Sequence, residues 1–205
     1  MGRIHSKLEK RRLQEKINFI LTRRNVTVFC GSKPGNDPRY TADATLLGST
    51  LADKGFDIVY GGGGKGMMGA LANGALAAGA TVTGILPQVL VDWESQHPSL
   101  TNVIITKDMH ERKKLLYEQG LAGIVLPGGF GTLDEMFEML TWNQLSIHNK
   151  KIYILNTAGF YNHLTQHLEH LIEKNFLYEP LWNRINKFDD PLSLVNELQI
   201  DLAYA

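Results

Sequence analysis

Residues 122–140 read Ala122-Gly-Ile-Val-Leu126, Pro127-Gly-Gly-Phe-Gly131 and Thr132-Leu-Asp-Glu-Met-Phe-Glu-Met-Leu140. The first segment is short and wholly apolar, which is typical of a parallel strand that is buried on both faces. The third segment repeats apolar residues at helical spacing and predicts a helix that ends at Leu145. The glycines between them leave the backbone bare at the junction. Together the three segments predict a strand–loop–helix unit of an α/β protein.

The same alternation of strand and helix runs along most of the chain. We expect strands over Val26–Cys30, Phe56–Tyr60, Thr81–Leu86, Asn102–Thr106, Ala122–Leu126 and Ile152–Asn156. We expect helices over Tyr40–Lys54, Met67–Ala78, Asp108–Gln119, Thr132–Leu145 and Tyr161–Asn175, with Pro191–Leu198 as the candidate for a last helix. Apolar strands separated by helices predict a doubly wound, Rossmann-like parallel sheet with helices on both faces. Ligands of such sheets bind in the loops beyond the carboxyl ends of the strands.

Length and composition indicate one compact domain with a sizeable core. The chain has 205 residues, of which 43% are hydrophobic and 20% charged, so a disordered chain is excluded. Its one cysteine, Cys30, rules out an internal disulfide and suits a reducing compartment, so we expect a cytoplasmic protein.

The charge is unevenly distributed. Residues 1–24 carry eight Lys or Arg and two Glu, whereas residues 25–205 carry thirteen Lys or Arg and nineteen Asp or Glu. We therefore divide the chain into a basic, helical N-terminal extension, 1–24, and a single Rossmann-like domain, 25–205, for which the motifs described below predict nucleotide binding and catalysis. The acidic balance of that domain argues against a nucleic-acid partner. The apolar stretch Gly69–Pro87 is interrupted by Asn73 and by glycines, so we expect no membrane span.

Two glycine loops predict a phosphate-bearing ligand. Gly64-Lys-Gly-Met-Met-Gly69 matches G-x-G-x-x-G between a strand and a helix, a pattern that is weak by itself. A dinucleotide site also needs an acid after the next strand, but none follows Leu86 before Asp92, and Lys65 lacks the Ser or Thr of a P-loop. Bare backbone N–H groups at helix N-termini still suit a phosphate. The second loop, Pro127–Glu135, has the same character and can share that ligand.

Glu135 has a structural interpretation beside a catalytic one. Thr132-Leu-Asp-Glu135 fits a capping box, with Thr132 as the N-cap and Glu135 three residues later. On spacing alone, the structural interpretation is favoured.

Arg112 follows a second capping pattern, Asp108-Met-His-Glu111, and so falls in the first or second turn of its helix. A cation is poorly placed there, because the helix dipole favours anions at that end. Arg112 and Lys113 are therefore candidates for binding an anion. The alternative is a solvated basic face that includes Lys114.

The motifs together resemble those of the Lonely Guy family, the cytokinin riboside 5′-monophosphate phosphoribohydrolases, which are often misnamed lysine decarboxylases. Pro127–Glu135 fits the family's PGGxGTxxE motif, and Met109-His-Glu-Arg-Lys113 is similar to its arginine motif. Further similar segments are Phe29–Ser32, Val59–Gly63, Gly66–Gly69 and Thr141–His148. The resemblance extends from about residue 26 to about residue 178.

The resemblance implies a homodimeric enzyme that hydrolyses the N-ribosidic bond of an adenine or N6-modified adenine nucleoside 5′-monophosphate. The products would be the free base and ribose 5-phosphate, without a metal or cofactor. The catalytic roles fall on Arg112 and Glu135. Substrate contacts fall on Ser32, Gly62, Gly63, Glu94, Lys113, Gly128, Gly129, Phe130, Gly131, Thr132, Leu133, Asp134 and Thr141. The chain departs from many relatives at Gly64-Lys65 and in its basic extension.

Three other classes of protein share some of these features. A nucleotide-binding protein without catalysis would carry the same glycine loops. A dinucleotide oxidoreductase is disfavoured by the missing acid after Leu86. A pyridoxal-phosphate decarboxylase needs a Schiff-base lysine, for which only Lys65 lies in a suitable loop.

Overall fold

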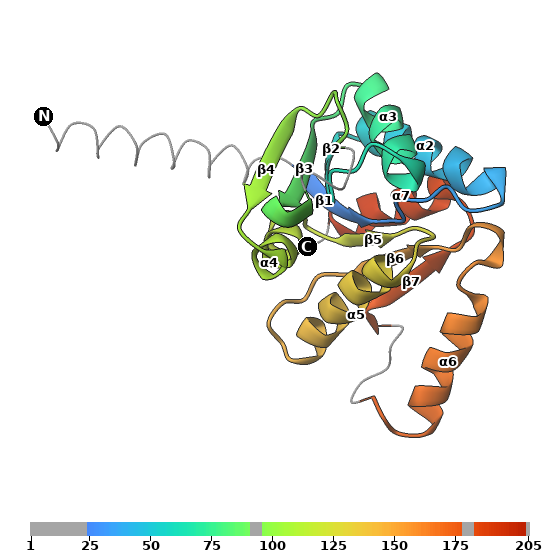
Figure 1. The fold of residues 1–205 in the computed structure, drawn as a ribbon. Helices are drawn as coiled ribbons and strands as arrows, with labels where there is room; N and C mark the ends of the chain where they lie inside the picture. Colours follow the sequence, from blue (N-terminus) through green and yellow to red (C-terminus); the bar gives the residue numbers. More distant parts are fainter. Residues whose placement is uncertain (1–23, 91–95, 178–182, 204–205) are drawn as a thin grey trace, which may run out of the picture.

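The computed structural model describes residues 24–90, 96–177 and 183–203. Within these residues, the strands form one parallel sheet in the order β4-β3-β2-β1-β5-β6-β7 (Figure 1). The strands are β1 (Arg24–Phe29), β2 (Phe56–Tyr60), β3 (Val82–Pro87), β4 (Asn102–Thr106), β5 (Gly123–Val125), β6 (Ile152–Leu155) and β7 (Ile185–Phe188). The helices are α2 (Pro38–Asp53), α3 (Gly66–Ala77), α4 (Met109–Gln119), α5 (Phe130–Gln144), α6 (Asn162–Glu173) and α7 (Pro191–Asp201). Short 3-10 helices lie at η1 (Gln88–Leu90) and η2 (Thr157–Gly159).

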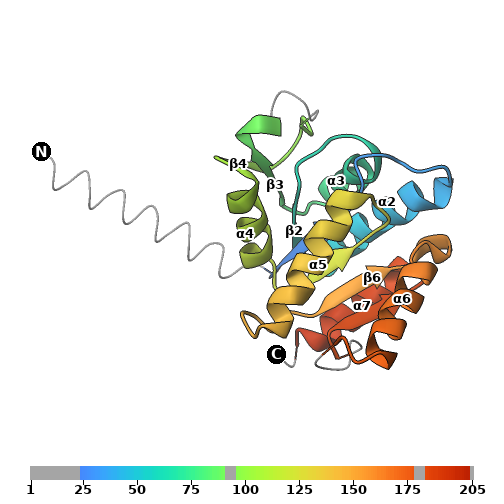
Figure 2. The same ribbon diagram turned by 60° about the horizontal axis from the view of Figure 1, so that its bottom comes forward.

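The helices cover both faces of the sheet, as the apolar strands predict (Figure 2). Val26 and Val28 of β1 are buried on the face covered by α2, α3 and α7, whereas Phe29 is buried on the face covered by α4, α5 and α6. A central strand such as β1 thus contributes side chains to two apolar cores, which is why both of its faces are buried. The predicted doubly wound, Rossmann-like fold is confirmed.

The strand order reverses between β1 and β5. The chain adds β2, β3 and β4 on one side of β1 and then returns to place β5, β6 and β7 on the other side. The loops after β1 and β5 therefore diverge toward helices on opposite faces of the sheet, α2 and α5. Such a reversal opens a crevice at the carboxyl ends of the strands, and it is the usual ligand site of open α/β sheets.

The start of α5 corrects the predicted capping box. The helix begins at Phe130 with Gly129 as its N-cap, and Leu133 N donates to Gly129 O at 3.1 Å. Thr132 is therefore inside the first turn and buried, and Glu135 lies in the second turn. A side chain on Gly128 would place its Cβ 2.1 Å from Thr132 Oγ1, so the hydroxyl fills the space that the glycine leaves. The expectation that Thr132 caps the helix was wrong.

Strand β7 was missed at the C-terminal edge of the sheet. Ile185 and Phe188 flank two consecutive polar residues, Asn186 and Lys187, and the strand pairs with β6 from Ile152↔Ile185 to Leu155↔Phe188. The last helix, α7, extends three residues beyond the predicted Leu198 and is capped by Asp190, whose carboxylate accepts from Ser193 N at 2.9 Å.

The division of the chain stays a prediction. The basic extension, 1–24, lies outside the described residues except for Arg24, which begins β1. No helix of the described part is both long and apolar enough to span a bilayer.

Candidate active site

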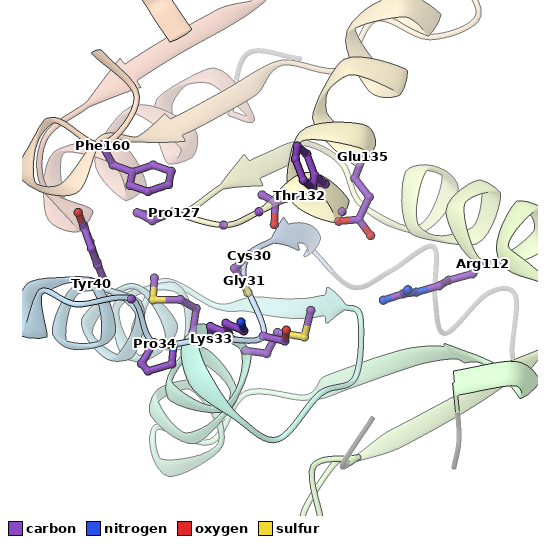
Figure 3. A pocket seen from close by; sticks show the side chains of 18 residues that line it. Cys30, Gly31, Lys33, Pro34, Tyr40, Arg112, Pro127, Thr132, Glu135 and Phe160 are labelled. Carbon is purple, nitrogen blue, oxygen red and sulfur yellow. The ribbon is translucent and has the colours of Figure 1, made fainter. Parts of the chain in front are cut away.

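A cavity of about 470 Å³ lies at the point where the strand order reverses. Its walls come from the loop after β1 (Cys30–Gly35), the loop after β5 with the first turn of α5 (Pro127–Thr132), and the start of α3 (Met67 and Met68). Figure 3 shows Arg112 and Glu135 at one end of this hollow, and Tyr40 and Phe160 at the other.

Two helices present uncapped N-termini to the cavity. In the described structure, neither Lys65 at the N-cap of α3 nor Gly129 at the N-cap of α5 makes a side-chain cap hydrogen bond. By contrast, α2, α4 and α7 are each capped by an aspartate, namely Asp37, Asp108 and Asp190. In α3 the Met68 N–H already donates to Gly31 O at 3.2 Å. The other first-turn N–H groups of α3 and those of α5, together with the helix dipoles, are suited to a bound anion.

Arg112 is a buried cation beside these termini. It lies one turn into α4, its residue is only 5% exposed, and its Nη2 donates to Gly61 O at 3.4 Å. Its Nε has no hydrogen-bond partner among the described residues. A Cβ on Gly61 would lie 2.4 Å from Nη2, so a glycine at the end of β2 is needed for the guanidinium to lie there. A buried guanidinium with a free donor is suited to an anionic ligand.

Glu135 points into the same end of the cavity from α5 (Figure 3). It is half-buried, and because α5 begins at Phe130 it has no capping role. Burial, and to a lesser extent the charge of Glu135, raise the pKa of the Cys30 thiol. Cys30 is therefore a neutral wall residue and not a nucleophile.

Two aromatic side chains form the other end of the cavity. The rings of Tyr40 and Phe160 meet there edge to face with centroids 5.7 Å apart. Met67 and Met68 also line the cavity, and Met68 lies at the Arg112 end, because a Cβ on Gly61 would lie 2.4 Å from Arg112 Nη2 and 3.3 Å from Met68 Cε. Phe130, at the start of α5, is 93% exposed beside the same cavity. Of these aromatic and thioether residues, only Phe130 was predicted from the sequence as a site residue. The positions of Tyr40 and Phe160 in the chain could have indicated a role in the site. Tyr40 lies in the segment that follows β1 and Phe160 in the segment that follows β6, and ligands of such sheets bind beyond the carboxyl ends of the strands.

Some predicted substrate contacts line the cavity and others do not. Ser32 and the run Gly128–Thr132 line it. Gly62 and Gly63 do not line the cavity; Gly62 O accepts from His97 N and Gly63 O accepts from the Tyr60 hydroxyl, both at 3.0 Å.

The remaining predicted contacts lie elsewhere. Lys113 and Asp134 form an ion pair with each other outside the cavity, and Leu133 packs against the core beneath α5. Thr141 borders a separate hollow between α5 and α6, and its hydroxyl donates to Phe137 O at 2.8 Å. Glu94 lies outside the described residues. No group of three or more His, Cys, Asp or Glu in the described part of the chain could hold a metal ion.

Comparison with solved structures defines the class of protein. The molybdenum cofactor carrier protein of Chlamydomonas reinhardtii superposes with a TM-score of 0.68 at 19% identity, covering 88% of this chain and 99% of that one. The structure titled TM1055 superposes with a TM-score of 0.66 at 22% identity, covering 86% and 99%. Fold and cavity together make this chain a Rossmann-like α/β protein with its site at the reversal of strand order.

Sequence comparison identifies the family. Residues 68–198 match the family described as "Possible lysine decarboxylase". The chain is 41% identical over 165 residues to the cytokinin riboside 5′-monophosphate phosphoribohydrolase of Rhodococcoides fascians, which covers 80% of this chain and 83% of that protein. It is 38% identical over 162 residues to the cytokinin riboside 5′-monophosphate phosphoribohydrolase LOG7 of Arabidopsis thaliana, covering 79% and 74%. The chain belongs to this family, the Lonely Guy phosphoribohydrolases, and the resemblance seen in the motifs is confirmed.

Proposed function

We propose that this chain hydrolyses the N-ribosidic bond of a purine nucleoside 5′-monophosphate and releases the free base and ribose 5-phosphate. The base is adenine or an N6-modified adenine. The observation that carries the proposal is the pairing, at one end of a single cavity, of the buried Arg112 with Glu135, beside two uncapped helix N-termini. The names of the relatives support the same reaction.

The chemistry requires one anion site and one carboxylate. The N–H groups at the starts of α3 and α5 bind the 5′-phosphate, and the energy of that remote contact positions the reacting bond. Cleavage builds positive charge on the ribose, which the Glu135 carboxylate stabilises while it orients the attacking water. Water adds to C1′ as the bond to the base breaks, and the base nitrogen takes the electron pair and a proton. Arg112 holds the phosphate or ribose and offsets the negative charge gathered there.

The aromatic end of the cavity is suited to a planar base. Tyr40 and Phe160 present ring faces and edges there. Such a wall binds a purine through apolar contacts with the face of the ring and leaves room for a substituent on the exocyclic nitrogen.

We further propose an obligate homodimer that pairs through α5. Met136 and Met139 of this helix are buried in the core, but Phe137 is 38% exposed beside the hollow between α5 and α6. Leu145, just beyond the helix, is also exposed. A second copy related by two-fold symmetry would cover this surface. A monomeric mass in dilute solution, with activity retained, would contradict the proposal. The partners are thus the nucleotide and a second copy, in a cytoplasmic setting.

The reaction is tested by incubating the purified full-length chain with AMP and measuring adenine and ribose 5-phosphate. We expect equal amounts of the two products, and expect them to be lost in Arg112→Ala. A protein that binds AMP but releases no adenine would be the non-catalytic alternative, and the proposal would fail.

A further inference from the structure

The loop that leads into α5, Pro127–Thr132, is held at its root by the side chain of a buried tyrosine. Strand β5 and its pairing with β6 both end at Val125. The next carbonyl, Leu126 O, accepts from the Tyr161 hydroxyl at 2.7 Å. Tyr161 is the N-cap residue of α6, 35 residues further along the chain. A side chain at the start of α6 thus provides a hydrogen bond at the point where the pairing with β6 has ended.

This hydrogen bond fixes a peptide group that has no other polar group to offer. The peptide between Leu126 and Pro127 carries a carbonyl but no N–H, because proline lacks one. The next carbonyl, Pro127 O, accepts from Gly31 N at 3.1 Å. Because a peptide group is planar, holding its carbonyl fixes the orientation of the whole group. The two bonds therefore set the direction in which the chain enters the uncapped start of α5.

Tyr161 is itself held by its surroundings. Its backbone N–H donates to Asn156 Oδ1 at 2.8 Å. The Nδ2 of the same buried amide donates to Asn162 Oδ1 and to Asp189 Oδ1, both at 3.0 Å. The Tyr161 ring meets Phe160 edge to face with centroids 4.8 Å apart. Burial raises the pKa of Tyr161, so the phenol keeps the proton that it donates. The hydroxyl therefore has a defined position beside the root of the loop.

The two partners of this hydrogen bond lie behind the cavity wall. Leu126 and Tyr161 are both buried and do not line the cavity, whereas their chain neighbours Pro127 and Phe160 do. Tyr161 belongs to the core on the face of the sheet that α5 covers. From this place its hydroxyl can affect a bound ligand only through the loop that it holds.

We propose that Tyr161 is a positioning residue for phosphate binding. Its hydroxyl holds the peptide group before Pro127 and so directs the N–H groups at the start of α5 toward the 5′-phosphate. Tyr161 makes no contact with the substrate. This inference rests on the proposed function and adds to it a residue that the motifs do not implicate.

A second buried tyrosine, Tyr153 of β6, provides a matched control. Its hydroxyl donates to Asp201 Oδ2 at 2.5 Å, in the core on the opposite face of the sheet. Neither of these two residues lines the cavity. Tyr153→Phe and Tyr161→Phe each remove one hydroxyl and one hydrogen bond from the interior, so both should lower stability. Only the second should weaken phosphate binding.

The test compares the full-length wild type with Tyr161→Phe, Tyr153→Phe and Asn156→Ala. For each protein we would measure kcat/KM for AMP and for adenosine, the dissociation constant of ribose 5-phosphate by isothermal titration calorimetry, and Tm. Adenosine has the same base and ribose but no phosphate. It therefore reports on Arg112 and Glu135 without the phosphate contacts.

We expect Tyr161→Phe to lower kcat/KM for AMP about tenfold and to weaken ribose 5-phosphate binding by a similar factor, as for binding groups displaced by a fraction of an ångström. Its kcat/KM for adenosine should match the wild type. Asn156→Ala should show the same pattern more weakly, because the hydroxyl remains but is held less firmly. Tyr153→Phe should lower Tm at least as much as Tyr161→Phe and leave both substrates and the sugar phosphate unaffected.

Unchanged ribose 5-phosphate binding in Tyr161→Phe would overturn the proposal, as would equal losses for AMP and adenosine. An equal loss of phosphate binding in Tyr153→Phe would also overturn it, because the effect would then follow from lower stability. If Tyr161→Phe does not fold, Asn156→Ala gives the same comparison. A wild-type chain that binds ribose 5-phosphate but releases no adenine refutes the proposed function, a result distinct from an active wild type whose phosphate affinity survives Tyr161→Phe.

Discussion

Helices α4 and α5 both begin at the carboxyl edge of the sheet, yet their first turns are completed differently. Asp108 caps α4 by accepting from Glu111 N at 2.9 Å, and Glu111 in turn accepts from Lys107 N at 2.9 Å. At the start of α5, Gly129 makes no side-chain cap within the described structure. The capped start satisfies its own N–H groups, whereas the uncapped start keeps them for a ligand. A missing cap beside a cavity is therefore a functional signal.

The largest effect that follows from the uncapped starts concerns the substrate's phosphate. We expect adenosine to be a worse substrate than AMP by about a thousandfold in kcat/KM, because two or three charge-assisted hydrogen bonds of about 1.5–3 kcal/mol each are lost. Parallel measurements of adenine release from both compounds check this. Comparable turnover would mean that the uncapped helix starts do not serve a phosphate.

Gly129→Asp would convert the start of α5 into the kind of start that α4 has. Gly129 is extended, with φ −99° and ψ −152°, and a Cβ there meets nothing within 4 Å, so aspartate fits. We expect Tm to stay level or rise, since an N-cap contributes about 1 kcal/mol. The KM for AMP should rise on the order of a hundredfold, because a fixed carboxylate then occupies the anion site and repels the phosphate. An unchanged KM would contradict the claim that the uncapped start of α5 binds the phosphate.

Asp108→Ala removes the side-chain cap from the start of α4. Removing this cap should lower the free energy of unfolding by about 1 kcal/mol, measured by urea denaturation. Turnover of AMP should stay close to normal, because the capped turn does not line the cavity. A large loss of kcat without a loss of stability would show that the start of α4 also acts in the site.

The smallest effect is a pH dependence of stability from His97 beside the first glycine loop. Its Nε2 lies 3.0 Å from Asn73 Oδ1, its Nδ1 accepts from Ser99 N at 3.2 Å, and burial lowers its pKa below the usual 6.5. The unfolded chain therefore binds the proton more readily, and stability should fall as the pH drops below about 6.5.

His148, whose pKa is also lowered by burial, contributes in the same direction. His97→Gln should reduce the slope of Tm against pH between 7 and 5. An unchanged slope would assign the effect to His148 or to other groups.

The fold could be predicted because its strands are apolar on both faces, as β5 and β6 are. Strand β7 could not, because an edge strand needs fewer apolar residues, and two of its four residues, Asn186 and Lys187, are polar. The start of α5 was misplaced because Thr132 and Glu135 have the spacing of a capping box, whereas a glycine loop begins the helix two residues earlier.

The proposed catalytic pair was named from motifs, but its surroundings were not. Tyr40 and Phe160 lie 120 residues apart and meet only in the folded chain. The ion pairs of Lys113 with Asp134 and Glu138 of α5 could not be predicted either, because sequence does not show which face of α4 meets α5. Local sequence patterns do not predict contacts between helices that belong to opposite halves of the sheet.

The central claim is that Glu135 acts in catalysis and not as a structural residue. The direct measurement is the melting temperature and the rate of AMP hydrolysis of the same purified Glu135→Gln protein. Glutamine keeps the shape and a similar helix propensity but loses the charge. The account predicts an unchanged melting temperature and a turnover lower by about a hundredfold or more, as for other positioned acid–base or electrostatic groups. A stable variant with near-normal turnover would contradict it.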